Sequence, residues 1–185
     1  MHKPWLTIIF LSVLPIATAQ EKNITLEDIW NGSFRTERME VLHSMDNGQQ
    51  YSVLNFNRIT RSTSVDLYDY KTQSKVQSLV DSKDLKAITY FTNYNFSDDE
   101  SKILLASEVE SIYRRSTLGL FFVYDLALKK LQRISDYKIQ EPTFSPDGWK
   151  VAYGFKNNLY VKDLETGQTK QITFDGEKNK IINGI

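Results

Sequence analysis

The chain has 185 residues, of which 41% are hydrophobic and 12% aromatic, and its 23 basic and 23 acidic side chains leave no net charge. This balance is that of an ordinary globular protein and excludes disordered and membrane-embedded classes. A neutral chain gives no electrostatic reason to expect nucleic acid as a partner. Because there is no cysteine, disulfides, thiolate metal sites and a cysteine nucleophile are also excluded.

Residues 1–19 have the pattern of a secretory signal peptide. Lys3 supplies a positive start, residues 6–16 are mostly apolar, and Ala17-Thr18-Ala19 places small residues before a cleavage point at Gln20. An uncleaved N-terminal anchor is the alternative, although the apolar run is short for a membrane span. An exported chain without cysteine fits a bacterial periplasm, cell surface or exterior. In the mature chain His43 would be the only histidine.

The residues after this segment predict one short helix. Thr25 and Asp28 have the spacing of a capping box, and Asn31-Gly32 supplies a stop signal. Three apolar side chains share one face, which we expect to pack on the body of the protein: Leu26, Ile29 and Trp30.

Residues 142–173 predict four short antiparallel strands joined by turns. The first turn is Ser145-Pro146-Asp147-Gly148, in which proline presets φ and glycine accepts a positive φ. Asn157-Asn158 and Glu165-Thr166-Gly167 form the next two joins. Four strands in so few residues make a unit of the size of one propeller blade. Such a unit cannot bury both faces by itself, so it implies neighbours of the same kind.

Two earlier units repeat this pattern. The Ser97 turn precedes the Ser145 turn by 48 positions, whereas the pair Tyr124-Asp125 precedes its match at Asp163 by only 38 positions. The earlier unit therefore holds ten extra residues between its second and third strands. A fainter first unit covers residues 40–80, with Tyr68-Asp69 as its matching pair, and residues 84–87 form a polar linker. The fold class predicted is all-β, a partial propeller of about three four-stranded blades.

The ten extra residues lie within residues 107–118. This stretch contains two glutamates, then the aromatic Tyr113 and two adjacent arginines, Arg114 and Arg115. Loops of a propeller reach its channel or a face, where partners bind. This insertion is therefore the candidate recognition site. A solvated hairpin without a binding role is the alternative, because exposed charge pairs of this kind are common and weak.

The sequence resembles bacterial dipeptidyl peptidase IV, of the prolyl oligopeptidase (S9) family of serine peptidases. The resemblance begins with residues 110–116 (Glu-Ser-Ile-Tyr-Arg-Arg-Ser), which are similar to the arginine loop of that family. Four further segments also resemble the family: residues 25–29, 144–148, 158–162 and 171–185. All of these segments follow one another along the chain in the same order as in the family, and the resemblance covers essentially the whole mature chain. Arg115 departs from the histidine more often expected after the loop arginine, which puts a role for Arg115 in doubt.

The resemblance implies an eight-bladed N-terminal propeller that caps a C-terminal α/β-hydrolase domain. The two together would remove Xaa-Pro or Xaa-Ala dipeptides from peptide N-termini, and the full-length protein would form a homodimer. Arg114, with a weaker contribution from Tyr113, would bind the substrate near a backbone carbonyl. The family's glutamate pair is expected just after Asn-Gly-Ile, so residues 20–185 would be the N-terminal part of the propeller, inactive alone, with no catalytic residue.

Other functions remain as alternatives. A non-enzymatic exported propeller that binds a protein or envelope partner would show the same blades and the same signal peptide. No cofactor is expected, and no metal site, because one mature histidine without cysteine cannot form a zinc site. A carboxylate site for Ca²⁺ stays open, but Asp98-Asp99-Glu100, the only acidic cluster, matches a turn of the repeat and favours a plain hairpin.

Overall fold

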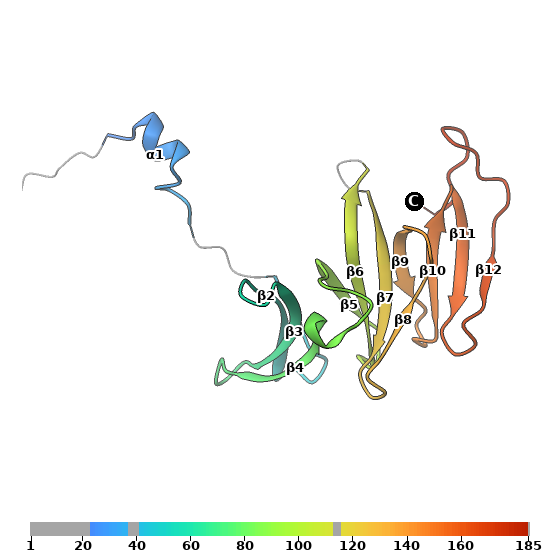
Figure 1. Cartoon of the computed structure of the whole chain (residues 1–185), viewed down its shortest axis with the longest axis horizontal. Helices are drawn as coiled ribbons and strands as arrows, with labels where there is room; N and C mark the ends of the chain where they lie inside the picture. Colours follow the sequence, from blue (N-terminus) through green and yellow to red (C-terminus); the bar gives the residue numbers. More distant parts are fainter. Residues whose placement is uncertain (1–22, 37–40, 113–115, 185) are drawn as a thin grey trace, which may run out of the picture. The chain divides into compact units, whose positions relative to one another are not determined.

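A computed structural model describes residues 23–36, 41–112 and 116–184, in which the chain forms two separate units (Figure 1). The first unit contains the helix α1, Leu26–Trp30. The predicted capping box is confirmed, since the Asp28 backbone N–H donates to Thr25 Oγ1 (3.1 Å) and the Thr25 N–H donates to the Asp28 carboxylate. None of the α1 residues is buried, and its packing on the body stays a prediction.

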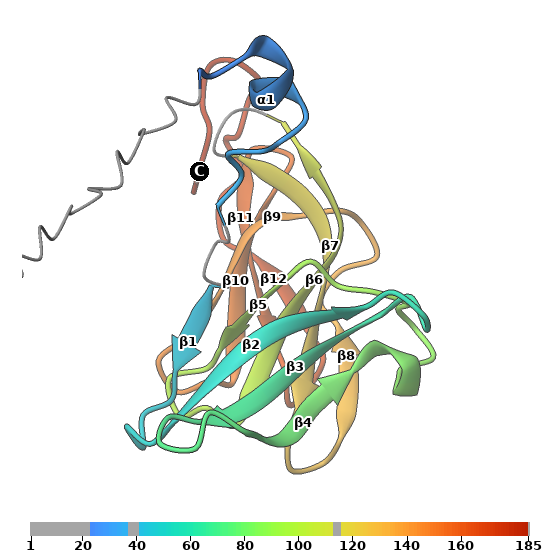
Figure 2. The same cartoon turned by 90° about the vertical axis from the view of Figure 1, so that its left-hand side faces the viewer.

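The second unit, residues 40–185, contains three four-stranded antiparallel sheets, as the repeat predicts (Figure 2). The first sheet, blade 1, consists of β1 Leu42–Ser44, β2 Gln50–Asn57, β3 Ser62–Asp69 and β4 Lys75–Asp81. Blade 2 consists of β5 Asn93–Phe96, β6 Lys102–Ser111, β7 Thr117–Asp125 and β8 Lys130–Arg133. Blade 3 consists of β9 Gln140–Phe144, β10 Lys150–Phe155, β11 Asn158–Asp163 and β12 Thr169–Gln171. In every blade the strands pair in chain order.

The repeated aspartate of each blade closes the turn between the third and fourth strands. A side-chain oxygen of Asp69, Asp125 and Asp163 accepts a hydrogen bond from the backbone N–H three residues later, in each case at 2.8 Å. This local bond stabilises the turn without any help from the core. The aspartate that recurs in the sequence repeat thus marks the same turn in each of the three blades.

Two hydrophobic cores lie between neighbouring blades. The first joins blades 1 and 2 and is built by Val65, Val80, Ile88, Phe91, Ile103, Leu105, Phe122 and Tyr124. The second joins blades 2 and 3 and is built by Leu104, Ala106, Phe121, Val123, Ile134, Ile139, Val151 and Tyr153. Alternate residues of β6 and β7 therefore enter different cores, because successive side chains of a strand point to opposite faces. Both faces of blade 2 are buried, which explains the unbroken apolar run in β6.

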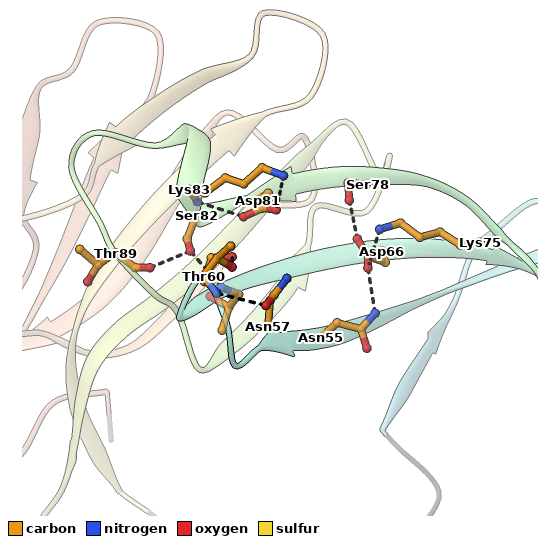
Figure 3. A network of polar contacts seen from close by, with 12 residues as sticks. Asn55, Asn57, Thr60, Asp66, Lys75, Ser78, Asp81, Ser82, Lys83 and Thr89 are labelled. Carbon is orange, nitrogen blue, oxygen red and sulfur yellow. Dashed lines mark hydrogen bonds and ion pairs between the residues drawn. The ribbon is translucent and has the colours of Figure 1, made fainter.

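The linker between blades 1 and 2 is more structured than its polar sequence suggests. It begins with the short 3₁₀ helix η1, Ser82–Asp84. Ser82 Oγ accepts from the Thr63 N–H (2.9 Å) and donates to the Thr89 carbonyl (2.7 Å), as Figure 3 shows for Thr89. The Phe91 N–H donates to Thr63 Oγ1 (2.8 Å). These bonds hold the linker against β3 and place the fully buried Phe91 in the first core.

No helix in the part of the chain that the structure describes has the length and apolar character needed to cross a bilayer.

Candidate functional site

The ten extra residues lengthen the hairpin formed by β6 and β7. The two strands pair continuously in register from Lys102↔Asp125 to Ser107↔Leu120, and pairing resumes, after an irregularity, from Glu110↔Leu118 to Ser111↔Thr117. The irregularity coincides with Glu108, which has a φ of 50°. The predicted insertion between the second and third strands is thus confirmed, and it extends the hairpin beyond the register irregularity.

The described part of the hairpin ends at a backbone hydrogen bond from the Ile112 N–H to the Ser116 carbonyl (2.9 Å). The predicted substrate-binding residues Tyr113 and Arg114, and the neighbouring Arg115, lie outside the described residues. Each is covalently within a few residues of this bond. The roles of Tyr113 and Arg114 therefore stay proposals.

The start of β7 is paired with the connection between blades 2 and 3. The Gly119 N–H donates to the Ile139 carbonyl (3.1 Å), and the Ile139 N–H donates to the Gly119 carbonyl (2.9 Å). A side chain at Gly119 would meet a Val109 methyl carbon at 3.1 Å and the Ser107 carbonyl at 3.2 Å, so glycine lets the strands approach closely here. Ile139 itself is fully buried.

The residues on either side of Ile139 contact the extended part of the hairpin. The Lys138 ammonium forms an ion pair with the Glu110 carboxylate on β6. The Gln140 side-chain amide donates to Ser116 Oγ (3.2 Å), next to the start of β7. One three-residue segment thus contacts both sides of the hairpin, close to the loop that carries Arg114.

A cavity of about 340 Å³ lies at the base of the same hairpin, between blades 2 and 3. Its polar lining includes Asn93 and Asn95 on β5, Thr117 on β7 and Glu141 on β9. Its apolar lining consists of Leu104, Ala106, Val109, Phe121 and Pro142, among others. A mixed surface of this size can accommodate part of a peptide. Sequence reasoning missed this cavity, because its walls come from four strands that have no local signal in common.

Glu141 has an unusual backbone at this cavity. Its φ is 45°, a left-handed conformation that non-glycine residues rarely adopt. It lies in β9, where the pairing with β10 changes register between Ala152 and Gly154. Glu141 is exposed and is one of the residues that line the cavity.

The acidic cluster Asp98-Asp99-Glu100 is the turn between β5 and β6, as the repeat predicts. The Asp99 carboxylate accepts hydrogen bonds from Ser97 Oγ (2.6 Å) and from the Ser101 hydroxyl (2.8 Å) and backbone, which lower the pKa of Asp99 to about 2. Glu100 instead accepts from the Asp46 N–H in blade 1 (2.7 Å). Among the described residues, no group of three or more histidine, aspartate or glutamate side chains is arranged to hold a metal ion.

His43 lies in β1 of blade 1, as expected, and its ring packs against Phe96 of β5 with 5.0 Å between centroids. This contact is structural, since it joins the first strands of two neighbouring blades.

Comparison with known proteins identifies relatives for almost the whole chain. Residues 97–185 match the family model of the dipeptidyl peptidase IV (DPP IV) N-terminal region. Prolyl endopeptidase FAP of Homo sapiens is 30% identical over 164 residues, which cover 88% of this chain and 20% of that protein. Dipeptidyl peptidase 4 of Felis catus is 39% identical over 97 residues, which cover 50% of this chain and 12% of that protein.

The fold has a similar relative among solved structures. The crystal structure of Porphyromonas gingivalis dipeptidyl peptidase 4 aligns with a TM-score of 0.73 and 30% sequence identity, over 86% of this chain and 23% of that one. The chain thus spans a fifth or less of the length of these curated relatives. The extended β6–β7 hairpin falls inside the region that the family model matches.

Proposed function

Because this chain belongs to the family of dipeptidyl peptidase IV N-terminal regions, we propose that it is the propeller portion of a serine-type dipeptidyl aminopeptidase. The whole protein removes Xaa-Pro or Xaa-Ala dipeptides from the N-termini of peptides. The propeller controls access and binds substrate, and an α/β-hydrolase domain outside this chain supplies the nucleophile, base and orienting acid. The full-length protein acts as a homodimer.

The observation that carries this proposal is the extended β6–β7 hairpin, and its residues 110–116 resemble the arginine loop of that family. Described residues on both sides of the loop are held, Glu110 by Lys138 and Ser116 by Gln140. A loop on such a support can present a side chain at a defined place, which recognition of a substrate backbone requires. The adjoining cavity offers amide and carboxylate groups beside an apolar wall.

Arg114 is the substrate-binding residue of this loop, with Tyr113 as a weaker contributor. A guanidinium stays protonated at every physiological pH and has five N–H donors in a planar fork. It is therefore suited to hold a substrate backbone carbonyl while carboxylates elsewhere in the protein bind the free amine. Arg115 is assigned no role in substrate binding.

The protein is exported to a bacterial periplasm, cell surface or exterior. Residues 1–19, which lie outside the described residues, are its signal peptide, and residues 20–185 belong to the propeller domain.

Steady-state kinetics of the full-length protein on a Gly-Pro or Ala-Pro amide tests the function and the role of Arg114 together. A hydrogen bond to a charged group contributes roughly 1.5–3 kcal/mol, so Arg114→Ala should lower kcat/KM by about 10- to 150-fold. Arg114→Lys should restore only part of this loss, because a point charge cannot reproduce the planar fork. Arg115→Ala is the matched control and should have a much smaller effect.

Two results would contradict the proposal. If the full-length protein does not release the dipeptide, the assigned activity is wrong and the non-enzymatic propeller is the better reading. If Arg115→Ala loses as much as Arg114→Ala, or if neither variant loses fivefold, the assigned role of Arg114 is wrong. Thermal melts of all three variants exclude misfolding as the cause.

A further inference from the structure

The end of the connection between blades 2 and 3, Lys138 and Ile139, together with Gln140, the first residue of β9, forms a segment that we call the strut. Ile139 is fully buried in the second core and pairs with Gly119 through two backbone hydrogen bonds. Neighbouring side chains of an extended segment point to opposite sides. Lys138 and Gln140 accordingly leave the core side and contact the hairpin.

The two strut contacts lie on opposite sides of the hairpin loop. Glu110 precedes the loop on β6, and Ser116 follows it immediately before β7. The Lys138 side chain is 26% exposed and the Glu110 side chain 66%, so the ion pair is partly open to solvent. The bond from Gln140 to Ser116 is partly buried. Each contact is weak alone, but the buried and backbone-paired Ile139 anchors both.

On the β6 side, the described part of the extended hairpin has few other contacts. Beyond the buried Ser107, Glu108, Glu110 and Ser111 are exposed and Ile112 is 41% exposed, and only Val109 packs against the second core. A two-stranded hairpin without a third strand or a packed face is marginally stable in water. The strut therefore supplies, from the next blade, the contact that a third strand would otherwise provide.

We propose that Lys138 and Gln140 are positioning residues for substrate recognition, and that they act by fixing the hairpin that carries Arg114. The inference rests on the proposed function of Arg114. Neither strut side chain needs to touch the substrate, because both act through the hairpin. Loss of the strut contacts leaves Arg114 present but spread over more positions, so a larger share of the protein is not competent to bind.

The test is a double-mutant cycle in the full-length protein on the same dipeptide amide. The variant Lys138→Met/Gln140→Ala removes both contacts and keeps Ile139. Since an exposed ion pair and one hydrogen bond are each weak, we expect a loss of roughly three- to tenfold in kcat/KM, mainly as a higher KM. In an Arg114→Ala background the same pair of substitutions should change kcat/KM by less than about twofold, because only the weaker contribution of Tyr113 remains to be positioned.

Three further variants separate positioning from general stability. Exchanging the charges in Glu110→Lys/Lys138→Glu should restore most of the activity that Lys138→Glu alone loses. Lys83→Met breaks another exposed ion pair, to Asp81 (3.1 Å) at η1 in the linker, and should leave kcat/KM unchanged. Amide hydrogen exchange reports on the hairpin directly. The Ile112 N–H, bonded to the Ser116 carbonyl, should exchange faster in the strut variant and normally in Lys83→Met.

The outcomes distinguish failure of the strut inference from failure of the proposed role of Arg114. If Arg114→Ala loses activity but the strut variant keeps both its kcat/KM and its Ile112 protection, the inference is wrong and the proposed function stands. If the strut variant loses equally in both backgrounds, its effect does not pass through Arg114 and the inference is again wrong. If Arg114→Ala loses nothing, the proposed role of Arg114 and the inference that rests on it are both overturned.

Discussion

At the scale of single residues, blade 1 contains a buried carboxylate whose charge is stabilised by three neighbouring donors. Asp66 on β3 is only 4% exposed, and its carboxylate accepts from Asn55 Nδ2 (2.9 Å), Ser78 Oγ (2.6 Å) and Lys75 Nζ (2.8 Å) (Figure 3). Burial raises the pKa of Asp66, but these three donors together lower it more, so the pKa lies below its usual value. A buried charge with this many donors stabilises its blade only while it remains ionised.

Asp66→Asn should therefore destabilise the protein at pH 7. The loss should be limited to about 1 to 2 kcal/mol, because Lys75 is partly exposed and solvent screens its charge. A carboxyl group with a lowered folded pKa stabilises above its unfolded pKa of about 4 and loses this effect as the pH falls through the folded value. The difference in Tm between wild type and variant should shrink below about pH 4. Asp98→Asn, at an exposed turn residue, is the control. A Tm difference that stays constant from pH 7 to pH 3 would show that ionisation of Asp66 is not the cause.

Single residues also show what the sequence can and cannot reveal. The aspartates at 69, 125 and 163 were recognisable because each bonds within its own turn, so the signal is local. The left-handed backbone of Glu141 has no such signal, because no glycine marks it and the register change beside it involves pairing with the next strand. The need for glycine at position 119 comes from the close approach of Val109 and Ser107, which become its neighbours only when the hairpin folds.

At the scale of elements, the strands and the hairpin extension were predictable from turn chemistry and from the difference between two repeat spacings. The ordered strands of each blade follow from alternating side chains between short turns. The strut was not predictable, since Lys138 and Glu110 are 28 positions apart and Gln140 and Ser116 are 24 apart. Contacts of this range are set by how one blade packs on the next. The supports of the candidate site therefore emerge only from the fold.

At the scale of the whole molecule, blade 2 interlocks with both neighbours. Its β5–β6 turn accepts a hydrogen bond at Glu100 from Asp46 of blade 1. From the first residue of β6, the Lys102 ammonium lies 4.1 Å from the Trp149 ring centroid in blade 3, a cation–π contact. With both faces buried as well, blade 2 is a rigid support for the hairpin that extends from it.

Export is a property of the whole chain and has its own test. If residues 1–19 are a signal peptide, expression in a bacterial host with an intact export pathway should yield a mature N-terminus at Gln20, partly cyclised to pyroglutamate. Intact mass and N-terminal peptide mapping measure this. Replacing Ala17 and Ala19 by larger residues should block the cleavage. Exported protein from the unaltered chain that retains peptides from before Gln20 would contradict the signal-peptide interpretation.

The most direct test of the central claim is a structure of the full-length protein with a bound Xaa-Pro dipeptide. The account predicts that the Arg114 guanidinium donates to a backbone carbonyl of the ligand at no more than about 3.2 Å, with the Lys138–Glu110 and Gln140–Ser116 contacts intact beneath it. A bound dipeptide that Arg114 does not contact, with the arginine directed into solvent, would contradict it.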